Sequence, residues 1–93
     1  MRAFEVHLNG ERLCVAGFDG YGVLNTMVDH VTAANGRDDI RLRVGGLMNA
    51  TEEHVMWTNL RLNVGDEVAL KVIETSSVDA PAQRYRTDTE RGG

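Results

Sequence analysis

The sequence lacks the features that mark secreted, membrane-spanning or nucleic-acid-binding proteins. Its single cysteine, Cys14, excludes an intramolecular disulfide and is typical of a reducing, cytoplasmic compartment. No apolar run approaches the roughly 18 residues that a membrane span needs, and a predicted strand follows Met1-Arg2 at once, so no signal peptide is expected. Aromatic residues make up 5% of the chain and the net charge is −4, which argues against nucleic acid as a partner.

What is present is typical of one soluble globular domain. The chain has 93 residues, of which 42% are hydrophobic and 26% charged, enough for a modest core without disulfides or metals. The one proline and most of the ten glycines lie between the predicted elements or near the end of the chain.

The clearest local signal is a hairpin near the start of the chain. Two alternating runs, residues 3–8 and 11–16, flank Asn9-Gly10, a pair that suits a two-residue type I′ turn. Such a turn places Leu8 opposite Glu11, Val6 opposite Leu13 and Phe4 opposite Val15, so that the apolar members of these pairs share one face.

An amphipathic helix is predicted from Val23 to Asn35. Its apolar residues recur at helical spacing, and Asn35-Gly36 suits a helix C-terminus; the apolar stripe is Val23, Leu24, Met27, Val28, Val31 and Ala34. This helix would cover the apolar face of the hairpin.

Three further strands are predicted after the helix. Residues 40–44 alternate strictly, and Gly45-Gly46 ends or bulges that strand. Residues 53–57 form a short edge strand, residues 58–64 a connector, and residues 67–74 the last strand. Residues 75–93 have few apolar positions and no periodicity, which indicates a flexible, disordered tail after a domain of residues 1–74.

This order of elements resembles the β-grasp fold of ubiquitin and of the small sulfur-carrier proteins. The resemblance covers residues 1–74 and depends on the hairpin, the single helix and the closing stretch Leu62 to Leu70. It implies an α+β domain with a mixed sheet of four or five strands, one packed helix, and a last strand that runs parallel to the first.

The chain ends in Arg91-Gly92-Gly93. In ubiquitin-like modifiers and sulfur carriers, a terminal Gly-Gly is the group that an activating enzyme adenylates, so the resemblance implies this role for Gly92 and Gly93. Residues without a Cβ can thread a narrow channel. A Gly-Gly in a loose polar tail is the alternative, since such tails favour glycine and this one is longer than in those families.

A second predicted site is a basic face of the sheet. With the strand order of the β-grasp fold, five cationic or titratable side chains would share the outer face and could attract an acidic protein; they are His7, Arg12, Arg41, Arg43 and Lys71. The alternative is an ordinary solvated face, partly neutralised by Glu5 and Glu67.

Catalytic and metal sites are not expected. Cys14 lies in the middle of a predicted strand without a neighbouring base, and nothing there would lower its pKa. The three histidines, His7, His30 and His54, come from different elements without ligand spacing.

The sequence therefore predicts a monomeric, non-enzymatic protein without cofactor or metal that acts by binding other proteins. In one hypothesis it is a modifier or sulfur carrier whose partner is an adenylating enzyme. In the other it is an adaptor or inhibitor that uses the basic face, and its tail is incidental.

Overall fold

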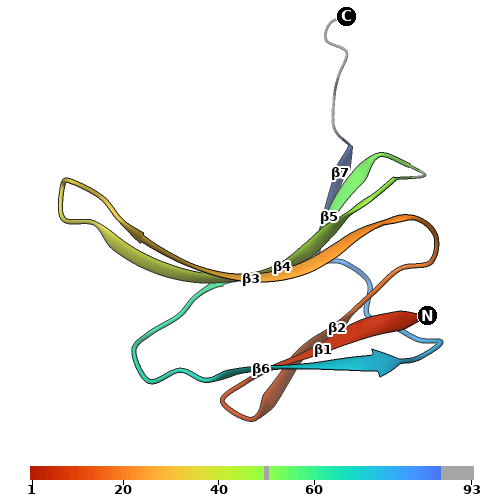
Figure 1. The fold of residues 1–93 in the computed structure, drawn as a ribbon, viewed down its shortest axis with the longest axis horizontal. Coiled ribbons are helices and arrows are strands. Elements are labelled where there is room, and N and C mark those ends of the chain that lie inside the picture. The colour runs from red at the N-terminus through yellow and green to blue at the C-terminus, as the bar shows by residue number, and fades with distance from the viewer. Residues whose placement is uncertain (50, 87–93) are drawn as a thin grey trace, which may run out of the picture.

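The computed structural model describes residues 1–49 and 51–86. These residues form seven β-strands and no helix, arranged in two sheets that pack face to face (Figure 1). The strands are β1 (Arg2–Leu8), β2 (Glu11–Ala16), β3 (Gly22–Thr32), β4 (Asp38–Met48), β5 (Glu53–Arg61), β6 (Val68–Glu74) and β7 (Gln83–Arg86).

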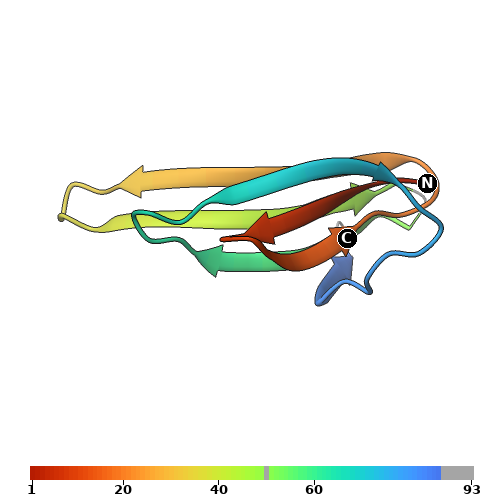
Figure 2. The same cartoon turned by 90° about the horizontal axis from the view of Figure 1, so that it is seen from below.

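Every pairing in both sheets is antiparallel. The three-stranded sheet has the order β2-β1-β6 and the four-stranded sheet the order β3-β4-β5-β7. The long strands of the two layers lie roughly along the same axis, with their arrows pointing both ways (Figure 2). The described part of the chain is thus an all-β, two-layered structure.

The predicted α+β class and β-grasp architecture are wrong. Residues 23–35, expected as a helix, form strand β3 and the turn after it. Five of the eleven residues in β3 are β-branched valine or threonine, which favours a strand. The stripe from Val23 to Val31 fits a two-residue period as well, with Val23 and Met27 on one face and Leu24 and Val28 on the other.

The expected helix end is a hairpin turn. The Ala33 N–H donates to the Arg37 carbonyl oxygen at 2.9 Å, and the Gly36 N–H donates to the Ala33 carbonyl oxygen at 3.0 Å. Gly36 has a φ of 87°, which glycine adopts without a Cβ penalty. Asn35-Gly36 therefore joins β3 to β4, as Asn9-Gly10 joins β1 to β2.

The first hairpin is confirmed, with a different register. Asn9 and Gly10 both have positive φ, 52° and 84°, and Leu8 lies opposite Glu11 as predicted. A bulge between Val6 and His7 then shifts the pairing, so that Val6 lies opposite Cys14. The extra residue, Leu13, lets Cys14 point into the core, and Leu13 itself is partly buried against it.

The predicted parallel pairing of the first and last strands is also wrong. Strand β6 pairs antiparallel with β1, from Arg2 opposite Glu74 to Leu8 opposite Val68, and it lies at the edge of its sheet. Without a helix to carry the chain across the sheet, β5 leads to β6 through the short loop of residues 62–67, and no crossover forms.

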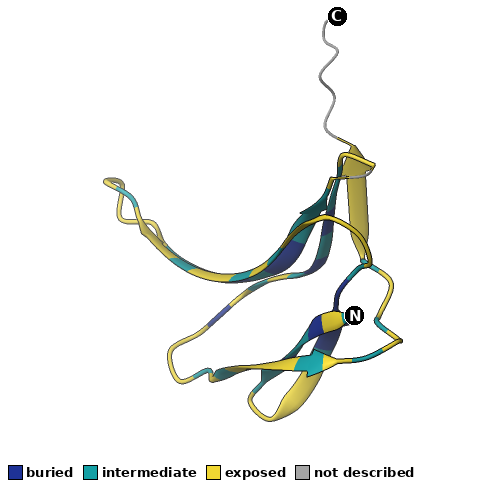
Figure 3. Ribbon diagram, turned by 45° about the vertical axis from the view of Figure 1, so that its right-hand side comes forward, coloured by how far each residue is buried: buried dark blue, intermediate teal, exposed yellow. Residues whose placement is uncertain are grey.

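The core lies between the two sheets. Figure 3 shows that both layers contain buried segments. The buried cluster consists of Val6, Cys14, Ala16, Leu42, Val44, Val55, Trp57 and Leu62. Strands β1, β2, β4 and β5 therefore supply this core together with Leu62, and the outer faces of β4 and β5 do not contribute to it.

The prediction of a disordered tail is wrong for residues 75–86. Residues 75–82 cross from one sheet to the other, and β7 extends the four-stranded sheet by pairing with β5. The Asp79 N–H donates to the Val15 carbonyl oxygen at 2.9 Å. Backbone pairing, which needs no apolar periodicity, is what orders this polar segment. Residues 87–93 lie outside the described residues.

Strands of the four-stranded sheet bend so that both of their ends turn away from the other sheet (Figure 1). The outer face of this sheet is therefore concave. Residues 1–49 and 51–86 contain no helix long and apolar enough to span a membrane.

Candidate functional site

The concave face holds a shallow hollow of about 290 Å³. Residues from all four strands line it, and we call it the outer hollow; it is formed by Val23, Asn25, Met27, Arg43, Gly45, Gly46, Leu47, His54, Val55, Met56 and Tyr85. Its volume is close to the lower end of the range for small-ligand pockets, which is roughly 300 Å³.

Two glycines form the floor of the outer hollow. A Cβ on Gly46 would lie 2.2 Å from the Val23 carbonyl oxygen, and one on Gly45 would lie 2.6 Å from the Val55 carbonyl oxygen. The β4–β5 pairing is also irregular between Val44 and Gly45. The extra residue at this irregularity is Trp57 of β5, so the bulge predicted at Gly45-Gly46 is not in β4, which continues to Met48. Because neither glycine has a side chain, the floor of the hollow consists of backbone atoms.

The rim of the outer hollow is apolar and exposed. Val23, Met27 and Tyr85 are 54%, 43% and 56% exposed. The rings of His54 and Tyr85 stack with centroids 5.2 Å apart and planes 16° apart, because β7 places Tyr85 directly opposite His54. The hollow thus offers apolar contact, one aromatic stack and the amide of Asn25.

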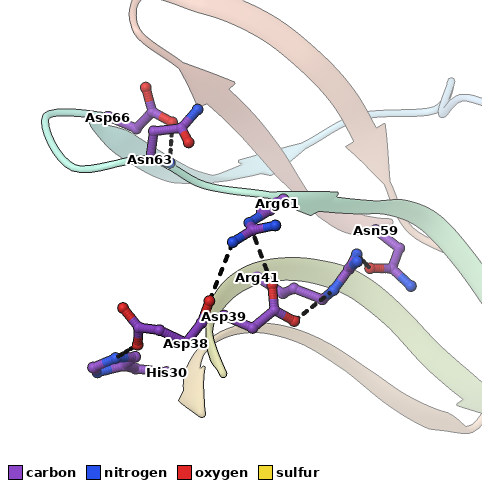
Figure 4. Close-up of polar contacts among 8 residues, drawn as sticks. All are labelled: His30, Asp38, Asp39, Arg41, Asn59, Arg61, Asn63 and Asp66. Atoms are coloured by element: carbon purple, nitrogen blue, oxygen red, sulfur yellow. Dashed lines mark hydrogen bonds and ion pairs between the residues drawn. The ribbon is translucent and has the colours of Figure 1, made fainter. Parts of the chain in front are cut away.

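A row of charged side chains adjoins the hollow on the same face. Arg43 Nη1 lies 2.7 Å from Asp29 Oδ2, and Arg41 Nε lies 3.1 Å from Asp39 Oδ2. Arg61 Nε lies 3.5 Å from Asp39 Oδ1 (Figure 4). We call Arg41, Arg43 and Arg61 the arginine row. The Arg43–Asp29 and Arg41–Asp39 pairs are part-buried, and the Asp39 side chain is only 14% exposed.

The structure divides the five predicted partner-binding residues between two sheets. Arg41 and Arg43 lie on the outer face of β4. His7 and Arg12 are opposite each other in the three-stranded sheet, and Lys71 is opposite Glu5 there. Because the outer faces of the two layers point in opposite directions, these residues do not form one basic face.

The predicted nonreactive character of Cys14 agrees with its surroundings. Its side chain is 4% exposed and packs in the core, and the Thr58 hydroxyl donates to Sγ at 3.5 Å. Burial raises the pKa of the Cys14 thiol, because a thiolate is poorly solvated there. The thiol is therefore protonated at neutral pH.

The histidines lie in three separate places. His7 is 3.4 Å from Glu5, His30 is bonded to Asp38 near the tip of the β3–β4 hairpin, and His54 stacks on Tyr85. Within residues 1–49 and 51–86, no group of three His, Cys, Asp or Glu side chains is placed to hold a metal ion.

Sequence reasoning missed most of the outer hollow. Met27 was assigned to a buried helical stripe, Met56 to an edge strand, and Tyr85 to the tail. The two-residue alternation of Val23, Asn25 and Met27 could have indicated the rim. Nothing local to Tyr85 indicates that β7 pairs with β5.

Comparison with protein-family models, with curated proteins and with solved structures gives no match for this chain.

Proposed function

We propose that this chain is a non-catalytic protein-binding module that takes its partner on the outer hollow and the neighbouring arginine row. The observation that carries the proposal is the exposed apolar rim on a concave face that the core does not use. Contiguous exposed apolar surface commonly marks an interaction site. The proposal keeps the earlier hypothesis of an adaptor or inhibitor, but moves its surface to the four-stranded sheet.

The chemistry of the hollow supports binding more than catalysis. Its floor is backbone, its rim is aliphatic and aromatic, and the ring of His54 is engaged with Tyr85. Aromatic, methionine and arginine side chains are enriched in protein interfaces. A cytoplasmic location remains part of the proposal, because the thiol of Cys14 is free.

The modifier or sulfur-carrier hypothesis stays a prediction. Gly92 and Gly93 lie outside the described residues, and the β-grasp architecture that favoured this role is absent from the described residues. An adenylating enzyme as partner therefore has no support from the fold.

Affinity capture with a matched pair of variants tests the proposed function. Met27→Glu places a charge on the rim, and Val64→Glu places the same charge on a residue that is 97% exposed and outside the hollow. We expect the tagged wild-type chain and Val64→Glu to retain the same specific partner, identified by mass spectrometry, and Met27→Glu to lose it.

Far-UV circular dichroism and thermal unfolding of both variants show whether each is folded. If folded Met27→Glu still captures the partner as the wild type does, the outer hollow is not the binding surface and the proposal fails.

A further inference from the structure

We infer that the segment bound on this face is an extended peptide in which a large apolar side chain and a carboxylate are four residues apart. This inference rests on the proposed function and specifies its partner. The apolar side chain would occupy the outer hollow, and the carboxylate would contact Arg41 and Arg61.

Positive charge is in excess on this face. The outer faces of β3, β4 and β5 carry three arginines and two aspartates among the described residues, although the whole chain has a net charge of −4. Among the described residues, Asp29 forms an ion pair with Arg43 alone, whereas Asp39 forms ion pairs with both Arg41 and Arg61. The neighbouring Asp38 does not compensate, because it lies on the opposite face, where it bonds to His30.

The guanidinium groups of Arg41 and Arg61 keep donors for a second carboxylate. Arg41 Nη1 donates to Asn59 Oδ1 and Arg61 Nη2 donates to the Asp38 carbonyl oxygen, both at 3.1 Å. A guanidinium has five N–H donors, and the side chain of Arg61 is 64% exposed. Arginine binds carboxylates well because its planar fork can donate two parallel hydrogen bonds.

The distance along β4 sets the spacing in the ligand. Arg41 and the hollow floor at Gly45 are four residues apart on one strand, which is about 13 Å at roughly 3.3 Å per residue. An extended peptide lying along β4 covers the same distance in four residues. Side chains at positions i and i+4 of such a peptide also point to the same side, so both can face the sheet.

Selection from a displayed library of random linear peptides, with the full chain as target, tests the inference. We expect enriched peptides to carry a large apolar residue and an Asp or Glu four positions away. One such peptide and its carboxamide analogue, with Asn or Gln in place of the acid, are then synthesised with a fluorophore for anisotropy titrations.

Three protein variants, one of them a double substitution, separate the two contacts. Arg41→Gln with Arg61→Gln should weaken the acidic peptide about tenfold and leave the carboxamide analogue unchanged, since the lost contact is charge-assisted. Met27→Glu should weaken both peptides. Arg12→Gln, on the other sheet, is the matched control and should change neither. Binding of the acidic peptide should also weaken with added salt.

Several results would overturn the inference. The inference is wrong if the selection enriches no peptides, or enriches peptides without an acidic residue at that spacing. It is also wrong if the wild-type chain binds the carboxamide analogue more tightly than the acidic peptide. The inference also fails if the variant with Arg41→Gln and Arg61→Gln binds the acidic peptide as tightly as the wild type does. A concentration-dependent dimer in sedimentation velocity that Met27→Glu abolishes would show that a second copy occupies the face instead. The proposed function fails separately, when folded Met27→Glu still captures the cellular partner.

Discussion

The indole Nε1 of Trp57 donates a hydrogen bond of 2.7 Å to the backbone carbonyl oxygen of Asp79. Asp79 in turn pairs with β2, since its carboxylate accepts the Val15 N–H at 2.8 Å and its own N–H donates to the Val15 carbonyl oxygen at 2.9 Å. One residue of the link between β6 and β7 therefore joins β2 in one layer to β5 in the other.

Replacing Trp57 by Phe should destabilise the protein by about 1–2 kcal/mol. The ring remains apolar, but the Asp79 carbonyl loses its donor in a part-buried position. For a chain of this size, each kcal/mol of lost stability lowers Tm by about 4–8 °C. Thermal unfolding is followed by far-UV circular dichroism, because the variant has no tryptophan whose fluorescence could be used. Tyr21→Phe, at a residue that is 84% exposed, is the control and should leave Tm unchanged. An unchanged Tm in Trp57→Phe would mean that this hydrogen bond is energetically neutral.

Asp66 should make stability depend on pH at the acid end. Its carboxylate accepts the Asn63 N–H at 2.8 Å and the Asn9 side-chain amide at 3.0 Å. The Asn63 hydrogen bond is the main cause that lowers the pKa of Asp66, and the Asn9 bond adds to it. A carboxyl whose pKa is lower in the folded state stabilises that state above its unfolded pKa. This contribution is lost as the pH falls through the folded pKa.

Urea unfolding of wild type and Asp66→Asn at pH 7, 5 and 3 measures this contribution. Wild type should be more stable at pH 7, and the difference should shrink at pH 3. The exposed Asp19 provides a matched Asp19→Asn control, for which we expect a much smaller difference. A gap between wild type and Asp66→Asn that is constant with pH would contradict the assignment.

Gly46→Ala should be the more damaging of two glycine substitutions. The new methyl group would lie 2.2 Å from the Val23 carbonyl oxygen, so β3 and β4 must separate, and we expect a loss of at least about 3 kcal/mol. Gly20→Ala is the comparison: its φ is 97°, but nothing lies within 4 Å of the new atom. That substitution should cost about 1 kcal/mol. Equal denaturation midpoints for the two variants would show that the strands separate without cost.

Deleting Gly92 and Gly93 distinguishes the two functional hypotheses. If the chain acts through the outer hollow, the shortened protein should capture the same partner with unchanged affinity, measured by titration with the purified partner. If the chain is a modifier or sulfur carrier, the deletion should abolish function. Complete loss of partner binding would therefore revive the modifier hypothesis.

The sequence predicts local features of this fold better than its pairings. Asn9-Gly10 identifies the first hairpin because the signal lies in adjacent residues. The strand segments at 40–44 and 53–57 fall within β4 and β5, and the segment at 67–74 matches β6 except that Glu67 lies outside it. Residues 23–31 fit both a helical and a two-residue period, and their pairing with β4, the next strand along the chain, decides between them. No local pattern can supply that information.

The candidate site was harder to predict, because it depends on which strands become neighbours. Arg41 and Arg43 were placed on an exposed face, which is where they lie. Their association with His7, Arg12 and Lys71 required one mixed sheet, and the chain forms two. Tyr85 is brought to the hollow by the backbone pairing of β7 with β5, which leaves no trace in the side-chain pattern.

The position of β1 between β2 and β6 has a consequence for biosynthesis. The Met1 carbonyl oxygen accepts the Thr75 N–H at 2.9 Å, so the two ends of this sheet meet across almost the entire described chain. A translating ribosome releases β1 and β2 long before β6, and the three-stranded sheet cannot be completed until Glu74 has left the exit tunnel. Such non-local topology is typical of domains that fold in milliseconds to seconds. Until β6 has been released, the nascent hairpin of β1 and β2 lacks the strand that pairs with the other edge of β1.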